Sequence, residues 1–221
     1  GFRDLDFSGF KVAFGGGAAI QQAVSERWRE VTGNYIKEGY GLSETSPVLT
    51  FNPIEEKTYR PGIGLPLPST DLSLRDDAGK EVAPGQPGEI CVTGPQVMRG
   101  YWRQPEATAA AMTTDGYFRT GDIGVMDADG YFRIVDRKKD MILVSGFNVY
   151  PNEVEGVVAQ MPEVLEVAAV DQPDDKSGEV VALFIVKKNA SLTADEVVAF
   201  CRRELTPYKV PRLIVFKTEL P

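Results

Sequence analysis

Hydrophobic and polar residues follow two periods along the first forty residues of the chain. A strand pattern over residues 11–14 stops at three glycines, a helical pattern follows and ends near Gly33, and a second strand pattern covers residues 35–38. The apolar residues expected on one helix face are Ala23, Val24, Trp28 and Val31. This order predicts a strand–helix–strand unit with glycine-bearing loops after its strands.

From residue 61 to residue 135 the pattern changes to short alternating stretches separated by turn residues. Residues 72–74 and 89–92 alternate as half-buried strands do, and a brief alanine-rich helix is expected within residues 104–112. Asp115-Gly116 and Asp129-Gly130 are typical hairpin turns, and each opens an aromatic and basic strand. This part is expected to be a twisted β-meander or a small barrel.

After Lys139 the pattern resets to the order β-α-β-β-α-β. The expected elements are strands at 141–144, 164–170, 180–186 and 213–216, a helix opened by Pro151 and a helix that runs from the Thr193–Glu196 capping box to about Glu204. The fold class predicted is therefore α/β and α+β. A strand–helix–strand unit with a β-meander or barrel fills residues 1–138, and a small α/β domain fills residues 139–221.

Composition and charge exclude several classes of function. The chain has 221 residues, 43% of them hydrophobic and 25% charged, which is ordinary for a globular protein. Its net charge of -8 argues against nucleic-acid binding, while local basic clusters such as Arg137-Lys138-Lys139 could still bind small anions. The chain contains no histidine, which excludes Ser–His and Cys–His nucleophile systems within this segment.

The cysteines, the absence of a long apolar stretch and the chain ends predict the cellular compartment and the extent of the chain. Cys91 and Cys201 lie far apart without metal-ligand spacing, which favours a reduced, cytoplasmic environment. No apolar stretch is long enough to span a bilayer, and no signal peptide opens the chain. Because the chain starts with Gly1 and stops just after a strand pattern, we expect a fragment of a longer protein.

Candidate binding residues follow the first two expected strands. Ligands of open α/β sheets collect at the carboxyl ends of strands, where Gly15–Gly17 and Gly39–Thr45 are expected to lie. Glycines admit a ligand close to the backbone, Tyr40 could stack on a base, and Glu44 could bind Mg²⁺. The structural alternatives are a tight turn, a core aromatic ring and a solvated carboxylate.

Four motifs in this order resemble the core motifs of the acyl-adenylate-forming superfamily, which includes acyl-CoA synthetases, adenylation domains and luciferases. They are Gly15–Ala18, Gly39–Thr45, Tyr117–Asp122, and Asp136–Asp140 with Ser145–Glu155. The stretch Asp115–Lys139 resembles the signature of fatty acyl-CoA synthetases. The whole chain is similar to the C-terminal half of bacterial long-chain fatty-acid–CoA ligases.

The resemblance implies an enzyme of the acid–thiol ligase class. A fatty carboxylate would attack the α-phosphorus of ATP to give an acyl-adenylate and pyrophosphate, and the CoA thiol would then displace AMP, with Mg²⁺ accompanying ATP. Residues 1–138 would be the C-terminal portion of the large adenylate-forming domain. Residues 139–221 would be the small mobile domain, truncated before its final loop. The family's phosphate loop and its C-terminal lysine are absent from the chain, so the segment alone is expected to be inactive.

The resemblance also implies roles for single residues. Glu44 would hold Mg²⁺, Thr45 would hydrogen-bond a phosphate, and Asp122 would accept both ribose hydroxyls. Arg137 would reach the ribose or a phosphate. The residues expected around adenine are Tyr40, Gly41, Gly15, Gly16 and Gly17.

Two further positions are implied in the small domain. Lys139 would be the hinge about which that domain swings, although Lys138-Lys139 could also be a solvated charge pair. Gly146 would let the pantetheine arm pass the backbone. Arg119 and Phe14 depart from the residues common in the family, and their roles stay open.

Rival functions remain. The enzyme could activate another acid, aromatic or amino, or the chain could be a non-catalytic nucleotide-binding module. Further expectations are peripheral contact with the inner face of the membrane, although no basic amphipathic helix supports it, and a homodimer.

Overall fold

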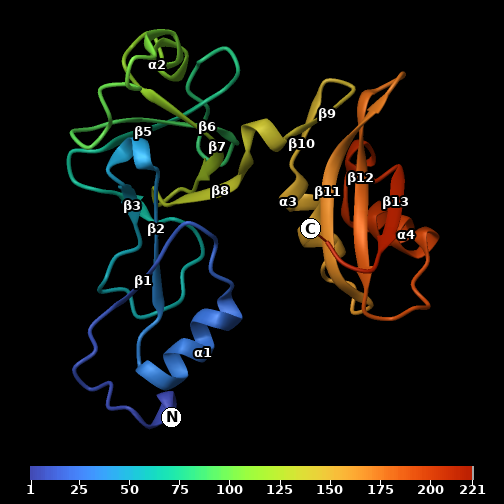
Figure 1. The fold of residues 1–221 in the computed structure, drawn as a ribbon, viewed down its shortest axis with the longest axis horizontal. Helices are drawn as coiled ribbons and strands as arrows, with labels where there is room; N and C mark the ends of the chain where they lie inside the picture. The colour runs from blue at the N-terminus through green and yellow to red at the C-terminus, as the bar shows by residue number, and fades with distance from the viewer. Residues whose placement is uncertain (221) are drawn as a thin grey trace. The chain divides into compact units, whose positions relative to one another are not determined.

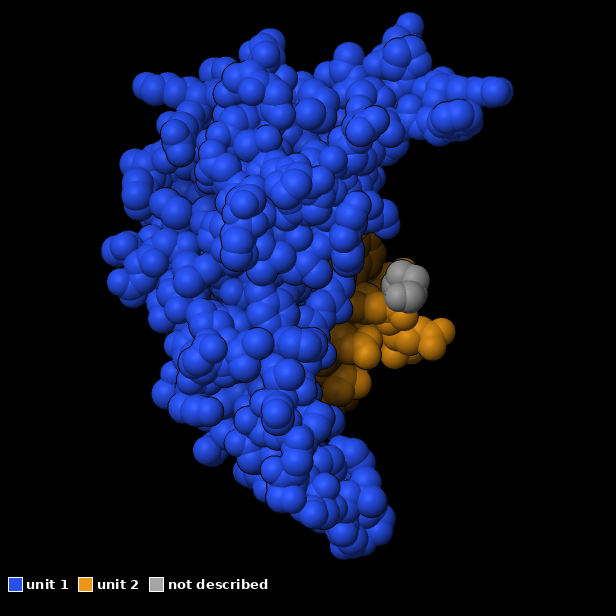
Figure 2. All heavy atoms as spheres, turned by 90° about the vertical axis from the view of Figure 1, so that its left-hand side faces the viewer, with its two compact units in different colours: residues 1–134 blue, residues 135–221 orange. Residues whose placement is uncertain are grey.

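The structure is a computed structural model that describes residues 1–220, and they form two compact units (Figures 1 and 2). The first unit ends at Ile134 and the second begins at Val135. The sequence-based boundary at 138/139 lies slightly further along the chain. Each unit has its own hydrophobic core.

The first unit opens with a mixed sheet whose strand order is β1-β2-β3-β4. Strands β1 and β2, which precede and follow helix α1 in the sequence, pair in parallel and confirm the strand–helix–strand unit. Strands β3 and β4 add antiparallel pairs that the sequence did not predict. The elements are η1 (Phe2–Asp4), β1 (Ala13–Gly15), α1 (Gln22–Thr32), β2 (Ile36–Gly41), η2 (Ser43–Thr45), β3 (Val48–Phe51) and β4 (Leu65–Pro66).

Helix α1 ends where the sequence predicts, but its buried face differs from the expected one. It ends at Gly33, whose positive φ of 80° suits glycine. Its buried residues are Ser25 and Thr32, whereas Val24 is exposed. The Ser25 hydroxyl accepts a hydrogen bond from the Ile36 amide at 3.1 Å, so a polar contact joins the helix to β2.

A second, antiparallel sheet of order β5-β6-β7-β8 completes the first unit. The strand order is that of a meander, one of the two expected alternatives. Its elements are β5 (Asp71–Arg75), β6 (Gly88–Thr93), α2 (Pro105–Ala111), β7 (Phe118–Met126) and β8 (Phe132–Arg137), the last of which continues across the unit boundary. Buried residues of both sheets share one core, including Leu49, Ile90, Val92, Phe118 and Phe132.

The second unit is a five-stranded sheet of order β10-β9-β12-β11, with β13 pairing in parallel with β12 (Figure 1). Its two helices, α3 and α4, pack into the same core. The elements are η3 (Lys138–Asp140), β9 (Ile142–Val144), β10 (Phe147–Val149), α3 (Pro151–Val158), β11 (Val164–Asp174), β12 (Gly178–Lys187), α4 (Ala194–Glu204), η4 (Pro207–Lys209) and β13 (Leu213–Lys217). Strand β10, which pairs with β9, and the short 3-10 turns were not expected.

Local chemistry confirms the predicted start of α4. The Thr193 hydroxyl accepts a hydrogen bond from the Glu196 amide at 3.3 Å, and the Glu196 carboxylate accepts one from the Thr193 amide at 2.9 Å. Both cysteines are buried and free, Cys91 in β6 and Cys201 in α4. Among the described residues, no helix combines the length and the apolarity needed to cross a membrane.

Candidate functional site

Two motifs that are far apart in the sequence meet in the first unit. The Tyr40 hydroxyl, on β2, donates a hydrogen bond to the Asp122 carboxylate, on β7, across a distance of 2.5 Å. Tyr40 is 9% exposed, so its ring is largely packed into the protein. This hydrogen bond therefore brings the glycine-rich motif around Tyr40 and the Thr-Gly-Asp motif together in the first unit.

The backbone around Asp122 is fixed by its own motif. The Thr120 hydroxyl donates to the Ile90 carbonyl at 2.8 Å and accepts from the Asp122 amide at 3.1 Å. Gly121, between them, has a φ of 76°, which favours glycine. A carboxylate on so constrained a segment of β7 is suited to accept hydrogen bonds from a pair of hydroxyls.

The glycine loop after β1 lies against the same strand β2. Gly15 is paired with Glu38 across the parallel ladder. A side chain at Gly16 would approach the Gly39 carbonyl oxygen to 3.1 Å, and Gly17 has a φ of 83°. The backbone conformation at Gly17 therefore favours glycine, and the space at Gly16 is tight for a larger residue.

The expected loop around Tyr40 is partly strand. Residues 36–41 belong to β2, and β3 pairs with Gly39 and Tyr40. The loop proper begins at Leu42, and a side chain at Gly41 would overlap the Pro47 carbonyl.

Glu44 follows this strand in the turn η2, and its carboxylate is oriented by another segment. The Tyr101 hydroxyl donates to Glu44 Oε1 at 3.0 Å, and the Met98 amide donates to the Glu44 carbonyl at 2.7 Å. Within the described residues, Oε2 has no recorded protein partner. Tyr101 carried no motif signal in the sequence, because only the fold brings it to Glu44.

The Thr45 side chain makes hydrogen bonds within the turn η2. Its side chain is fully buried, and its hydroxyl oxygen accepts from the Leu42 amide at 2.9 Å and lies 2.6 Å from the Pro47 carbonyl, to which it can donate. These contacts close the turn. The Ser43 hydroxyl, beside Glu44, is exposed.

Glu44 is the acidic residue of this turn that could bind Mg²⁺. The described residues contain no cluster of three or more His, Cys, Asp or Glu side chains able to bind a metal. A single carboxylate with one available oxygen fits an ion that is held mainly by ligand phosphates and waters, which is the common arrangement for Mg²⁺. Glu44 is therefore suited to Mg²⁺ that arrives with a nucleotide.

The two departures from the family pattern have structural roles. Arg119 donates to the buried Glu89 carboxylate at 2.8 Å and so joins β7 to β6. The hydrogen bonds that Arg119 donates to the Glu89 carboxylate raise the pKa of Arg119. Phe14 is exposed, and its ring packs edge-on against Phe51 with centroids 4.8 Å apart.

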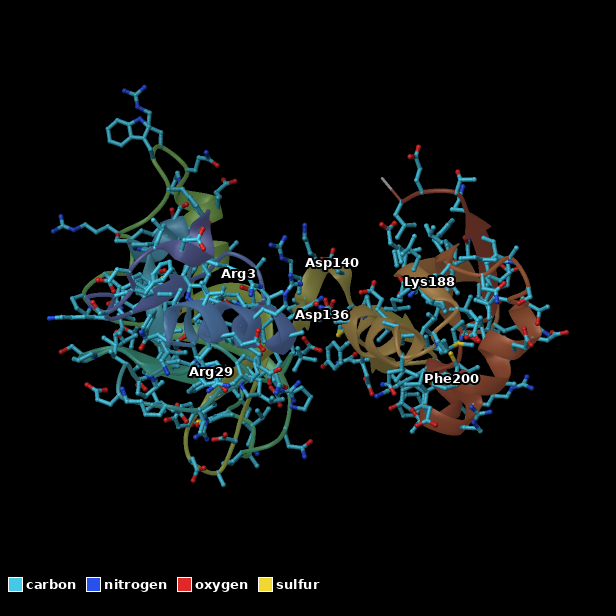
Figure 3. The ribbon with its side chains drawn as sticks, turned by 90° about the horizontal axis from the view of Figure 1, so that it is seen from below. Arg3, Arg29, Asp136, Asp140, Lys188 and Phe200 are labelled. Carbon is cyan, nitrogen blue, oxygen red and sulfur yellow. The ribbon has the colours of Figure 1, made fainter. Side chains whose placement is uncertain are left out.

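In the second unit, the segment before the predicted hinge is attached to helix α3. The buried Asp136 carboxylate accepts hydrogen bonds from the Arg137 amide at 2.8 Å and from the Asn152 amide at 2.9 Å. Asp136 and Asp140, labelled in Figure 3, lie on either side of Lys139 in the sequence, at the end of β8 and in η3. Arg137 and Lys139 are both exposed.

Gly146 lies on an open turn between β9 and β10. It is exposed, its φ is 84°, and a side chain built there would meet no atom within 4 Å. The preceding Ser145 also has a positive φ, of 51°. The turn thus presents bare backbone on the surface of its unit.

Comparison with known proteins adds family information. The family of AMP-binding enzymes matches residues 2–102, and the AMP-binding enzyme C-terminal domain matches residues 153–221. A long-chain-fatty-acid–CoA ligase of Escherichia coli O157:H7 is 57% identical over 220 residues, which cover all of this chain and 39% of the relative.

Two other similar proteins are a further synthase and a solved structure. A feruloyl-CoA synthase from an Amycolatopsis species is 39% identical over all of this chain and 45% of its own length. The crystal structure of ATP-bound MatB from Rhodopseudomonas palustris matches with a TM-score of 0.86 at 36% identity, over 95% of this chain and 42% of that one. The chain thus spans about two-fifths of the length of the relatives that it matches.

Proposed function

Because the chain belongs to the family of AMP-binding enzymes, we propose that the complete protein is a long-chain fatty-acid–CoA ligase. It would activate a fatty acid with ATP and transfer the acyl group to CoA. The observation that carries this proposal is the hydrogen bond from Tyr40 to Asp122, which joins two nucleotide-binding motifs separated by 82 residues.

The proposed chemistry has two balanced steps. A carboxylate oxygen of the acid attacks the α-phosphorus of ATP, and the bond to the bridging oxygen of pyrophosphate breaks. The thiol sulfur of CoA then attacks the acyl carbon, and AMP leaves while the thiol proton is released. Mg²⁺, when bound through the phosphates and Glu44, would neutralise charge on the phosphates.

The protein residues would mainly bind and orient the nucleotide. Asp122 would accept both ribose hydroxyls, Tyr40 and Gly41 would lie near adenine, and the loop of Gly15, Gly16 and Gly17 would border its edge. Thr45 would keep the turn closed, and we propose that the exposed Ser43 hydroxyl makes the phosphate contact expected of Thr45.

The second unit would supply the mobile residues. Arg137 would reach the ribose or a phosphate, and Lys139 would be the pivot between the two steps. Gly146 would give the pantetheine arm a path along bare backbone, which its exposed position supports.

The test is acyl-dependent exchange of pyrophosphate into ATP, measured with the complete protein and long-chain fatty acids, ferulate and amino acids as the acid. Exchange and thioester formation with fatty acids are expected. Exchange with only an aromatic acid would replace the proposed substrate, and ATP binding without exchange for any acid would favour a non-catalytic module. The 221-residue chain alone is expected to show no exchange.

Two further partners are proposed. Trp102 is 82% exposed in a loop beside Arg99 and Arg103, a combination suited to an anionic lipid surface. Co-sedimentation of the complete protein with anionic vesicles should fall for Trp102→Ala and stay unchanged for Phe14→Ala. A homodimer is also proposed, and sedimentation velocity tests it.

A further inference from the structure

Both backbone polar groups of one residue, Ile20, are held by side chains from other segments. The Ile20 amide donates to Glu38 Oε1 at 3.1 Å, and the Ile20 carbonyl accepts from the Tyr59 hydroxyl at 3.0 Å. Ile20 lies just before helix α1, where backbone groups have no partner within the helix. We refer to these two contacts as the Ile20 clamp.

The acidic half of the clamp is buried. Glu38 is 7% exposed, and this burial raises the pKa of its carboxyl, although the hydrogen bond from Ile20 opposes the shift. Burial also raises the pKa of Tyr59, with a contribution from the nearby charge of Glu38. A buried carboxyl costs free energy unless it is hydrogen-bonded. The packing of Glu38 therefore favours the position in which it holds Ile20.

The clamp closes the glycine loop at its C-terminal end. At the other end, Gly15 is fixed in the ladder with β2, directly opposite Glu38. A side chain at Gly15 would overlap that of Ile20, so the two ends of the loop touch. Residues 16–19 between them are all exposed. The loop therefore faces solvent while both of its ends are fixed.

We propose that Glu38 and Tyr59 are positioning residues that hold the Gly15–Ala19 loop in the conformation that receives the nucleotide, and so set the affinity for ATP. This inference rests on the proposed function of the loop. Neither residue needs to touch the nucleotide, because a loop that is already ordered loses less conformational entropy on binding. A merely structural role would change stability without a selective effect on ATP.

The experiment compares Glu38→Ala, Glu38→Gln and Tyr59→Phe in the complete protein. Glu38→Gln keeps an oxygen that can accept the Ile20 amide, so it should restore the behaviour of the wild type. The matched controls are Glu55→Ala, an exposed acid on the neighbouring segment, and Tyr35→Phe, whose ring lies 6.2 Å from that of Tyr59. The measurements are the Kd for ATP by calorimetry, KM for ATP and for the acid, kcat, and hydrogen exchange of the Ile20 amide.

Glu38→Ala and Tyr59→Phe should each raise the Kd and KM for ATP about 5- to 10-fold, the effect of losing one hydrogen bond. The KM for the acid and kcat should change less than about 3-fold on the same basis, and the Ile20 amide should exchange faster. If the Ile20 amide exchanges faster but the Kd for ATP stays unchanged, or if all KM values rise together, the inference is overturned. If Glu38→Ala does not fold, Tyr59→Phe decides alone.

The failure of the proposed function is a separate outcome. A wild-type protein that binds ATP but activates no acid would end the ligase proposal, while the Kd for ATP would still test the clamp. Unchanged Kd in both Glu38→Ala and Tyr59→Phe, in an active wild-type background, would end the clamp proposal alone.

Discussion

Replacing Tyr40 with phenylalanine isolates the contact that joins the two motifs of the first unit. The substitution keeps the ring, which is 9% exposed, and removes only the hydroxyl that donates to Asp122 at 2.5 Å. A hydrogen bond to a charged acceptor contributes about 1.5–3 kcal/mol. Because Asp122 is partly exposed to water, we expect the lower end of that range, about 1.5 kcal/mol.

Both tryptophans of the chain, Trp28 and Trp102, lie in the first unit, so their fluorescence reports its unfolding selectively. With a urea dependence of about 2 kcal/mol per M, Tyr40→Phe should lower the unfolding midpoint by about 0.7 M. Combining it with Asp122→Ala in a double-mutant cycle should give a coupling of about 1–2 kcal/mol.

Tyr131→Phe is the control, since the Tyr131 ring stacks under Arg60 and no hydrogen bond of its hydroxyl is recorded in the described part of the chain. It should leave the midpoint unchanged. If Tyr40→Phe unfolds at the wild-type midpoint, or if the cycle shows no coupling, the contact does not join the motifs energetically. The proposed common site would then lose its main support.

Three further expectations concern the substitution Gly41→Ala, the pH dependence of Asp115 and the chemical labelling of Cys201. Gly41→Ala would push a methyl group into the Pro47 carbonyl and should destabilise the first unit by about 3 kcal/mol in the same urea assay; a wild-type midpoint would contradict this. Arg75 donates hydrogen bonds to both carboxylate oxygens of Asp115 and holds the pKa of Asp115 below its ordinary value of 3.8. The ionised Asp115 therefore stabilises the folded state above pH 3.8, and this stabilisation is lost as the pH falls. The stability advantage of the wild type over Asp115→Asn should therefore shrink between about pH 5 and pH 2.5, and a constant difference would refute it. Burial raises the pKa of Cys201 to about 11, so iodoacetamide should label it, by mass spectrometry, only after denaturation; labelling of the native chain would contradict its burial.

Sequence periodicity predicted most elements because most are long enough to show it. Helix α4 and strands β11 and β12 have nearly the expected bounds, and the Thr193 capping box was visible as a local signal. Strands β3, β4 and β10 have at most four residues, and their partners lie elsewhere in the chain. Their existence depends on pairing with neighbours, which no local pattern reveals.

Within the candidate site, local motifs identified residue types but not their partners. Glu44 follows strand β2 and Asp122 lies within strand β7, each in a recognisable motif. Tyr101 and Tyr59 carry no motif of their own and become relevant only through contacts with residues 57 and 39 positions away. Thr45 lies beside Glu44 in the same motif, and the motif did not reveal that its hydroxyl also contacts the Pro47 carbonyl within the turn.

Strand β2 explains why these separate contacts belong to one arrangement. Alternate residues of a strand point to the same face, so Glu38 and Tyr40 share one side of β2. Glu38 holds the end of the glycine loop through Ile20, and Tyr40 holds the carboxylate of Asp122. A shift of the strand by one residue would turn both side chains to the opposite face and break both contacts together. The pairing register of β2 with β1 and β3 is therefore what sets the glycine loop and Asp122 in place, although neither lies on β2.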